Sequence, residues 1–121
     1  MSDVLSDPLD RAQIELLQSL DDGDGAALLE IVVEFLAMSE ESRVELFGCL
    51  RAGDAQGAER AAHTLKGASA NVGAAALAAV CAAMEARARQ GQPQVAAQLT
   101  EQFEAEFVRA RTALQSVASR P

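Results

Sequence analysis

The sequence predicts an all-α protein: an antiparallel up-down four-helix bundle with an additional short N-terminal helix. Of the 121 residues, 50% are hydrophobic, but only 3% are aromatic, and there is neither Trp nor Tyr. This alanine-rich composition suits close-packed helices and offers few of the β-branched and aromatic residues that strands favour. Apolar residues also recur at three- and four-residue steps, the spacing of amphipathic helices. A chain of this length is expected to form one domain, over residues 1–121, with a core of its own.

The N-terminal helix is expected over about residues 8–20. It begins at Asp7-Pro8, because proline fits the first turn of a helix, where its missing N–H leaves no hydrogen bond unmade. The acidic, glycine-containing stretch 21–25 then predicts a turn and the N-terminal cap of the next helix.

Three further breaks delimit the helices of the bundle, which spans about residues 26–118. Gly53-Asp54, Val72-Gly73 and Gly91-Gln92-Pro93 contain the glycine and proline residues that end helices. The four helices are therefore expected over residues 26–51, 55–71, 74–90 and 94–119. Loops as short as these favour antiparallel neighbours.

The charge of the chain argues against several kinds of partner. The formal net charge is −8, and an acidic surface repels nucleic acid and anionic membranes. The N-terminus lacks the basic and then apolar pattern of a secretory signal. The longest apolar stretch, 31–38, is interrupted by Glu34 and is too short to span a membrane. We expect a cytoplasmic monomer without membrane insertion, and the Met1 start favours a free-standing protein over an excised domain of a longer one.

The two cysteines, Cys49 and Cys81, are far apart in the sequence and each lies in an apolar helical segment. We interpret them as small buried hydrophobic residues of a protein in a reducing compartment. A disulfide or a reactive thiol is the alternative.

The single histidine, His63, lies in the third predicted helix and is the candidate nucleophile. A projection at about 100° per residue places a core stripe on the opposite side of this helix: Ala58, Ala61, Leu65, Ala68 and Val72. His63 therefore points outward, with Lys66 and Gly67 one turn along. A neutral imidazole is nucleophilic near neutral pH, a nearby cation offsets the charge of a phosphoryl group, and glycine leaves room for another protein. The alternative is a surface histidine that happens to lie beside a lysine.

Residues 63–73, HTLKGASANVG, resemble the signature of histidine phosphotransfer (HPt) domains, H-x-L-K-G-x-[SA]-x-x-[hydrophobic]-G, at every fixed position. The layout of the helices extends the resemblance over about residues 26–118. It implies that His63 accepts a phosphoryl group from an aspartyl phosphate of a receiver domain and passes it to another receiver. Lys66 would then compensate charge, and Gly67 would provide clearance.

The resemblance also implies the partners: response-regulator receiver domains, a hybrid sensor histidine kinase, or both, in a bacterial two-component phosphorelay. The phosphoprotein would need no cofactor of its own, because Mg²⁺ is expected on the partner receiver domain. Such a chain is a phosphocarrier and not an ATP-dependent kinase.

Glu85 is a further candidate, on geometric grounds. If the third and fourth helices form a hairpin centred near Gly73-Ala74, residues equally far from the centre lie side by side. Glu85 would then lie near His63 and could accept a hydrogen bond from Nδ1–H, which leaves Nε2 free. The alternatives are that Glu85 is solvated or that it pairs with Arg89 at i+4.

The second helix carries more apolar side chains than one core stripe requires, between Leu28 and Met38. The surplus lies partly under the N-terminal helix, and the remainder could form a docking patch beside His63. Complete coverage by the N-terminal helix is the alternative.

Three other functions fit the sequence less well. A self-phosphorylating kinase needs a phosphate-binding loop and a nucleotide-binding fold, for which this helical chain has no sequence signal. A metal-binding bundle would need more ligands than one histidine without an inward carboxylate pair. A helical adaptor without phosphoryl transfer is the alternative that remains.

Overall fold

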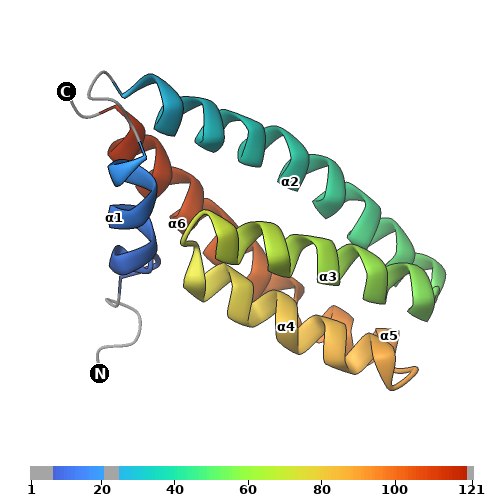
Figure 1. Cartoon of the computed structure of the whole chain (residues 1–121). Helices are drawn as coiled ribbons and strands as arrows, with labels where there is room; N and C mark the ends of the chain where they lie inside the picture. Colours follow the sequence, from blue (N-terminus) through green and yellow to red (C-terminus); the bar gives the residue numbers. More distant parts are fainter. Residues whose placement is uncertain (1–6, 21–24, 120–121) are drawn as a thin grey trace.

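The computed structural model describes residues 7–20 and 25–119. Most of the turn predicted over 21–25 thus lies outside the described residues. Within them, the chain is all-helical, with these elements: α1 (Arg11–Ser19), α2 (Ala26–Ala52), α3 (Ala55–Asn71), α4 (Ala75–Arg89), α5 (Pro93–Ala96), the 3₁₀ helix η2 (Ala97–Leu99) and α6 (Thr100–Ala118). The predicted fold class, a four-helix bundle with an extra N-terminal helix, is confirmed (Figure 1).

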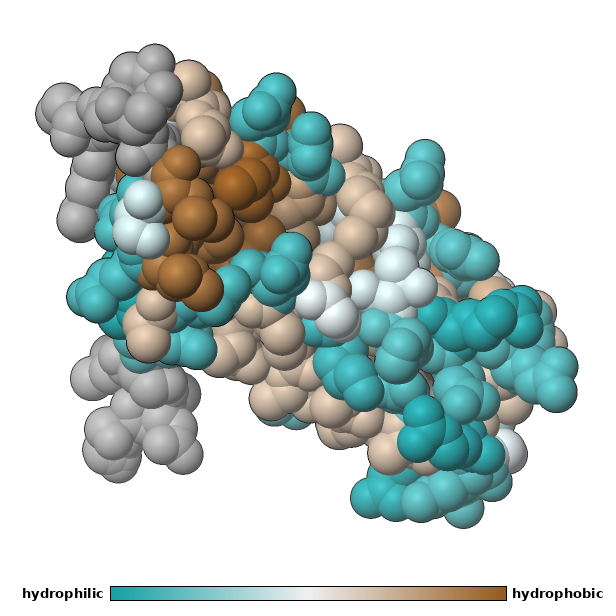
Figure 2. All heavy atoms as spheres, in the orientation of Figure 1, coloured by the Kyte–Doolittle hydropathy of each residue, from teal (hydrophilic) through white to brown (hydrophobic). Residues whose placement is uncertain are grey.

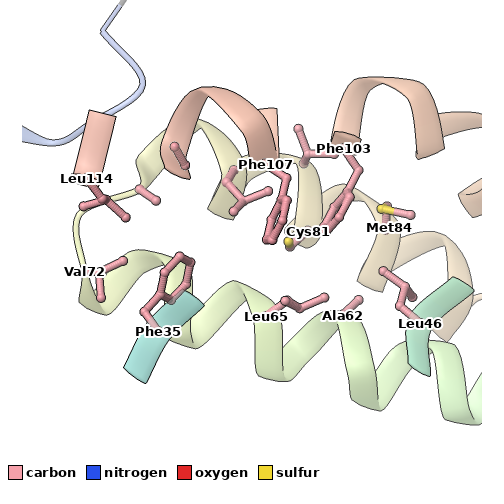
Figure 3. Close-up of a cluster of buried hydrophobic side chains, with 14 of the residues drawn as sticks. Phe35, Leu46, Ala62, Leu65, Val72, Cys81, Met84, Phe103, Phe107 and Leu114 are labelled. Atoms are coloured by element: carbon pink, nitrogen blue, oxygen red, sulfur yellow. The ribbon is translucent and has the colours of Figure 1, made fainter. Parts of the chain in front are cut away.

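The four long helices α2, α3, α4 and α6 form the bundle, and α1 lies across one end (Figure 1). Their apolar side chains point toward one another in the centre (Figure 3). Fully buried members of this core come from every long helix: Leu46, Leu65, Leu77, Met84, Phe103 and Leu114. Full burial of a side chain of this size contributes about 1.5–3 kcal/mol. The core is therefore the main source of stability.

The first helix begins later than the sequence predicts. Helix α1 starts at Arg11 and not near residue 8, because Asp10 is the N-cap: its Oδ1 accepts a hydrogen bond of 3.1 Å from the N–H of Ala12. Pro8 precedes the helix, and its carbonyl accepts a hydrogen bond from the N–H of Ala76. The sequence rule for proline therefore located the helix but not its first residue.

The predicted final helix over 94–119 is divided. Residues 93–96 form the short helix α5, residues 97–99 form the 3₁₀ turn η2, and α6 follows from Thr100. Turns of 3₁₀ geometry are common at the ends of α-helices and as connectors between them. Periodicity alone did not reveal this change.

The turn between α3 and α4 fixes the register of these two helices and holds α1. Gly73 has φ +81°, and a Cβ there would lie 3.2 Å from Ile14 Cδ1. The N–H of Asp10 donates a 2.6 Å hydrogen bond to the Gly73 carbonyl, and Gln13 Nε2 donates one to the Asn71 carbonyl. Glycine is therefore needed both for the left-handed conformation and for the close approach of α1.

The two cysteines are both free. Cys81 is fully buried in α4, and burial raises the pKa of its thiol to about 12. Cys49 is half-buried at the end of α2, where burial and the neighbouring Asp54 raise its pKa. Both thiols stay protonated near neutral pH, which suits packing and not nucleophilic chemistry.

No helix within residues 7–20 and 25–119 combines the length and the hydrophobicity that a membrane-spanning segment needs.

The α2–α3 turn generates a prediction about stability. Asp54 is the N-cap of α3 and accepts a 3.0 Å hydrogen bond from the N–H of Gly57, where an added Cβ would lie 2.6 Å from Cys49 Sγ and collide with the Asp54 carboxylate. Gly57→Ala should therefore lower the free energy of unfolding by about 1–3 kcal/mol, through overpacking and a disturbed cap. Urea denaturation measures this.

The matched control is Gly48→Ala in α2, where the nearest atom to an added Cβ is Arg51 Nη2 at 4.0 Å. This change should raise stability by about 0.5–1 kcal/mol, because alanine favours the helix more than glycine does. If both variants were stabilised to a similar extent, the steric argument for Gly57 would be wrong.

Candidate functional site

His63 lies in the middle of α3, with its side chain 67% exposed. Its neighbours Ala62 and Leu65 are completely buried. The imidazole therefore points away from the core, on the face that the helical projection predicts. Its accessible edge can meet a group carried by another molecule.

Glu85 of α4 lies beside this ring, with a side chain that is only 4% exposed. Its Oε2 is 2.8 Å from His63 Nδ1 and 2.7 Å from Arg89 Nη2, and its Oε1 is 2.7 Å from Lys66 Nζ. The predicted contact with His63 and the alternative pairing with Arg89 therefore occur together, and Glu85 is not solvated. The hairpin register explains the first contact, and the i+4 spacing within α4 explains the second.

The environment of Glu85 decides its charge and, through it, the tautomer of His63. Burial alone would raise the pKa of this carboxyl group, but hydrogen bonds from Lys66 and His63 outweigh it and hold the pKa below its ordinary value. Glu85 is therefore ionised near neutral pH and can only accept hydrogen bonds. It follows that Nδ1 of a neutral His63 carries the proton, while Nε2 has its lone pair free.

Gly67 lies one turn after His63 on the exposed side of α3, and a Cβ added there would have no atom within 4 Å. A shallow depression borders it, lined by Gln13, Met38, Gly67, Ala68, Ala70 and Asn71. Helices α1, α2 and α3 all contribute to this depression. The surface beside the histidine is therefore open and contains small side chains.

The apolar surplus of α2 is only partly covered. Leu28, Val32 and Phe35 are buried, but Leu29 is 49% and Val33 is 56% exposed. The alternative of complete coverage by the N-terminal helix is therefore wrong, because α1 lies across one end of the bundle and α2 is much longer. Figure 2 shows hydrophobic atoms gathered at the end of the visible face where α1 and the beginning of α2 lie.

The sequence analysis considers Arg89 only as an alternative partner of Glu85 and does not predict its contact with Glu59 of α3. Arg89 Nε donates to Glu59 Oε2 at 2.9 Å, so that one guanidinium joins two carboxylates on different helices. Glu59 precedes His63 by one helical turn, and the hairpin register that places Glu85 near His63 also places Glu59 near Arg89, which was the available signal. Among the described residues, no three His, Cys, Asp or Glu side chains form a group that could hold a metal ion.

Fold and site together define a class of protein: a small helical bundle that presents one imidazole outward, with a buried carboxylate on Nδ1 and a cation and a glycine one turn away. The sequence pattern of the Hpt domain family matches residues 30–115. This chain belongs to the Hpt domain family.

Two solved structures are similar to this chain. One is histidine-containing phosphotransfer protein B (HptB) from Pseudomonas aeruginosa PAO1, with 35% sequence identity and a TM-score of 0.85 over 94% of this chain and 96% of that chain. The other, provisionally described as a histidine-containing phosphotransfer protein from rice, has 22% identity and a TM-score of 0.80 over 92% of this chain and 79% of that one, and it supports the fold alone. Comparison with curated proteins gives no match.

The lowered pKa of Glu85 generates a prediction about pH. Because the folded-state pKa lies below the unfolded one, ionised Glu85 stabilises the fold above the unfolded pKa, and this contribution disappears as the pH falls through the folded pKa. Glu85→Gln should therefore cost about 1–3 kcal/mol at pH 7, where a charged hydrogen-bonding group is lost. The difference between wild type and variant should shrink below about pH 4, near the ordinary pKa of glutamate. Denaturant titrations at several pH values measure it.

Glu45→Gln, at an exposed position of α2, is the control and should have a small effect over the same pH range. A Glu85→Gln deficit that stayed constant down to about pH 3, below the ordinary pKa of glutamate, would contradict the assignment of an ionised, buried carboxylate.

Proposed function

We propose that this chain is a phosphocarrier of a two-component phosphorelay, which accepts a phosphoryl group on His63 from a receiver-domain aspartate and passes it to another receiver. The observation that carries the proposal is the pairing of an exposed imidazole with a buried, ionised carboxylate on Nδ1. This pairing directs the nucleophilic lone pair of Nε2 outward. The family membership and the 35% identity to HptB support the same function.

The chemistry needs little from this chain. The lone pair of Nε2 attacks the phosphorus of the aspartyl phosphate, the N–P bond forms, and the P–O bond breaks with its electron pair remaining on the aspartate. The Nδ1 proton stays on the ring, which becomes cationic. The Glu85 carboxylate, 2.8 Å from Nδ1, stabilises this positive charge and fixes the orientation of the ring. The reverse sequence delivers the phosphoryl group to a second receiver.

Lys66 would compensate the negative charge of the phosphoryl group. Its ammonium group is bound to Glu85 Oε1, yet the side chain is 37% exposed. A lysine has a flexible stem with a compact charge at its end, so that Nζ can turn from Glu85 toward phosphoryl oxygens on Nε2. Such charge compensation is the main requirement of phosphoryl transfer, together with positioning.

The depression beside Gly67 is the proposed docking surface for the receiver. It adjoins His63 along α3, and Met38 and Ala68 give it apolar character. Because its small side chains leave the approach open, a receiver active site can come close to Nε2.

We propose that the receiver also supplies the Mg²⁺. The chain itself acts in the cytoplasm as a monomer and does not use ATP.

The central prediction concerns His63. The chain is incubated with Mg²⁺ and with receiver domains encoded in the same genome, phosphorylated beforehand by labelled acetyl phosphate. Wild type should acquire acid-labile, base-stable label, as expected of a phosphoramidate, and His63→Gln should acquire none. Label on the variant would locate the acceptor elsewhere, and an unlabelled wild type would favour the adaptor function.

The variant Gly67→Ala distinguishes an effect on the stability of the fold from an effect on the rate of phosphoryl transfer. The substitution should raise the free energy of unfolding by up to about 1 kcal/mol, because the helix gains alanine and no atom obstructs the Cβ. It should slow phosphoryl transfer about tenfold, because the methyl group occupies the approach of the receiver. Rapid-quench measurement of the labelled chain gives the rate.

Gly48→Ala is the control, since it makes the same change in α2 at a position that does not line the depression. It should leave the transfer rate unchanged. A Gly67→Ala variant that transfers at the wild-type rate would remove the clearance role.

A further inference from the structure

Arg89 connects the two carboxylates that flank His63. Its Nη2 donates to Glu85 Oε2 at 2.7 Å, and its Nε donates to Glu59 Oε2 at 2.9 Å. Its side chain is 62% exposed, so that these ion pairs, and not burial, hold the guanidinium in place. The planar guanidinium can bind two acceptors in fixed directions, which a lysine cannot do.

Glu85 therefore has two cationic partners on different atoms. Lys66 occupies Oε1, while Arg89 and His63 share Oε2. With a neutral imidazole, the charges of Lys66 and Arg89 balance those of Glu59 and Glu85. The cluster is thus electrically neutral before a phosphoryl group arrives.

Lys66 cannot serve Glu85 and a phosphoryl group equally well at the same time. When Nζ turns toward phosphoryl oxygens, the buried Glu85 carboxylate loses one of its cations. A buried charge left without a partner is strongly unfavourable. Arg89 remains on Oε2 and reduces this cost, and its second contact with Glu59 keeps it there.

We propose that Arg89 is a positioning residue that holds the Glu85 carboxylate on His63 Nδ1 and compensates its charge while Lys66 is released to the phosphoryl group. The proposal rests on the phosphocarrier function above. Without Arg89, Lys66 is bound more firmly by Glu85, and the carboxylate is less well fixed on Nδ1. Both effects slow transfer without removing the nucleophile.

The test compares transfer from a phosphorylated receiver to wild type, Arg89→Ala, Arg89→Lys and Arg87→Ala. Arg89→Ala should be about three- to tenfold slower, and Arg89→Lys intermediate, because one ammonium group cannot bridge both carboxylates. Arg87→Ala is the matched control: it removes the same charge from the same helix, where Arg87 Nη1 contacts Gln90 Oε1 at 3.5 Å. It should transfer at the wild-type rate.

The same comparison in a Glu85→Gln background identifies the route of the effect. The uncharged amide of that background needs no compensation, so that Arg89→Ala should slow transfer less than about twofold further. A residue that only joined α3 to α4, or that bound the receiver directly, would slow transfer or raise KM equally in both backgrounds. That outcome would overturn the proposal.

A second measurement does not depend on phosphoryl transfer. The ¹⁵N NMR shifts of the His63 ring in the unphosphorylated protein report which nitrogen carries the proton. Arg89→Ala should decrease the Nδ1–H fraction, and Arg87→Ala should leave it unchanged. If wild type transfers phosphate but Arg89→Ala matches Arg87→Ala in rate and ring shifts, the positioning role is wrong. If the shifts change as expected and wild type accepts no phosphate, the phosphocarrier function fails while the positioning of the ring by Arg89 is supported.

Discussion

The buried carboxylate of Glu85 is the interaction on which the site depends. A carboxylate with 4% side-chain exposure is costly to bury, and here the cost is offset by the imidazole, by Lys66 and by Arg89. Each of these groups is thereby held in a defined place on an otherwise exposed surface. The carboxylate thus gives a fixed orientation to a surface imidazole that would otherwise sample several rotamers.

This arrangement requires that α3 and α4 lie close together in a fixed register. Alanines such as Ala58, Ala61 and Ala62 form the buried face of α3 and keep the distance between helices short. The tight turn at Gly73, against which α1 packs, then places Glu85 opposite His63. The short first helix, which contributes no reactive group, therefore belongs to the support of the site.

The site is sparse, and the requirements of the proposed reaction explain why this suffices. One oriented imidazole, one exchangeable cation and an open approach at Gly67 meet the needs of a carrier that exchanges a phosphoryl group with an active site on another protein. The two thiols, by contrast, are poor nucleophiles, because Cys81 is buried, Cys49 is half-buried, and the pKa of each is raised. Among these three side chains, only His63 is therefore available as a nucleophile to a partner.

The sequence by itself determined the all-α class, the approximate helices, the outward histidine and the presence of Lys66 and Gly67 beside it, because helical periodicity and local motifs depend on residues close together in the chain. It even indicated Glu85, since a hairpin relates positions at equal distances from its turn. Only the tertiary structure decided that Glu85 binds His63, Lys66 and Arg89 together and that Arg89 also reaches Glu59. The division of the last helix is a feature of backbone geometry that the periodicity did not reveal, whereas the start of α1 follows from a local signal, the N-cap Asp10. Side-chain networks between helices depend on interhelical distance and rotation, and these are properties of the packed bundle as a whole.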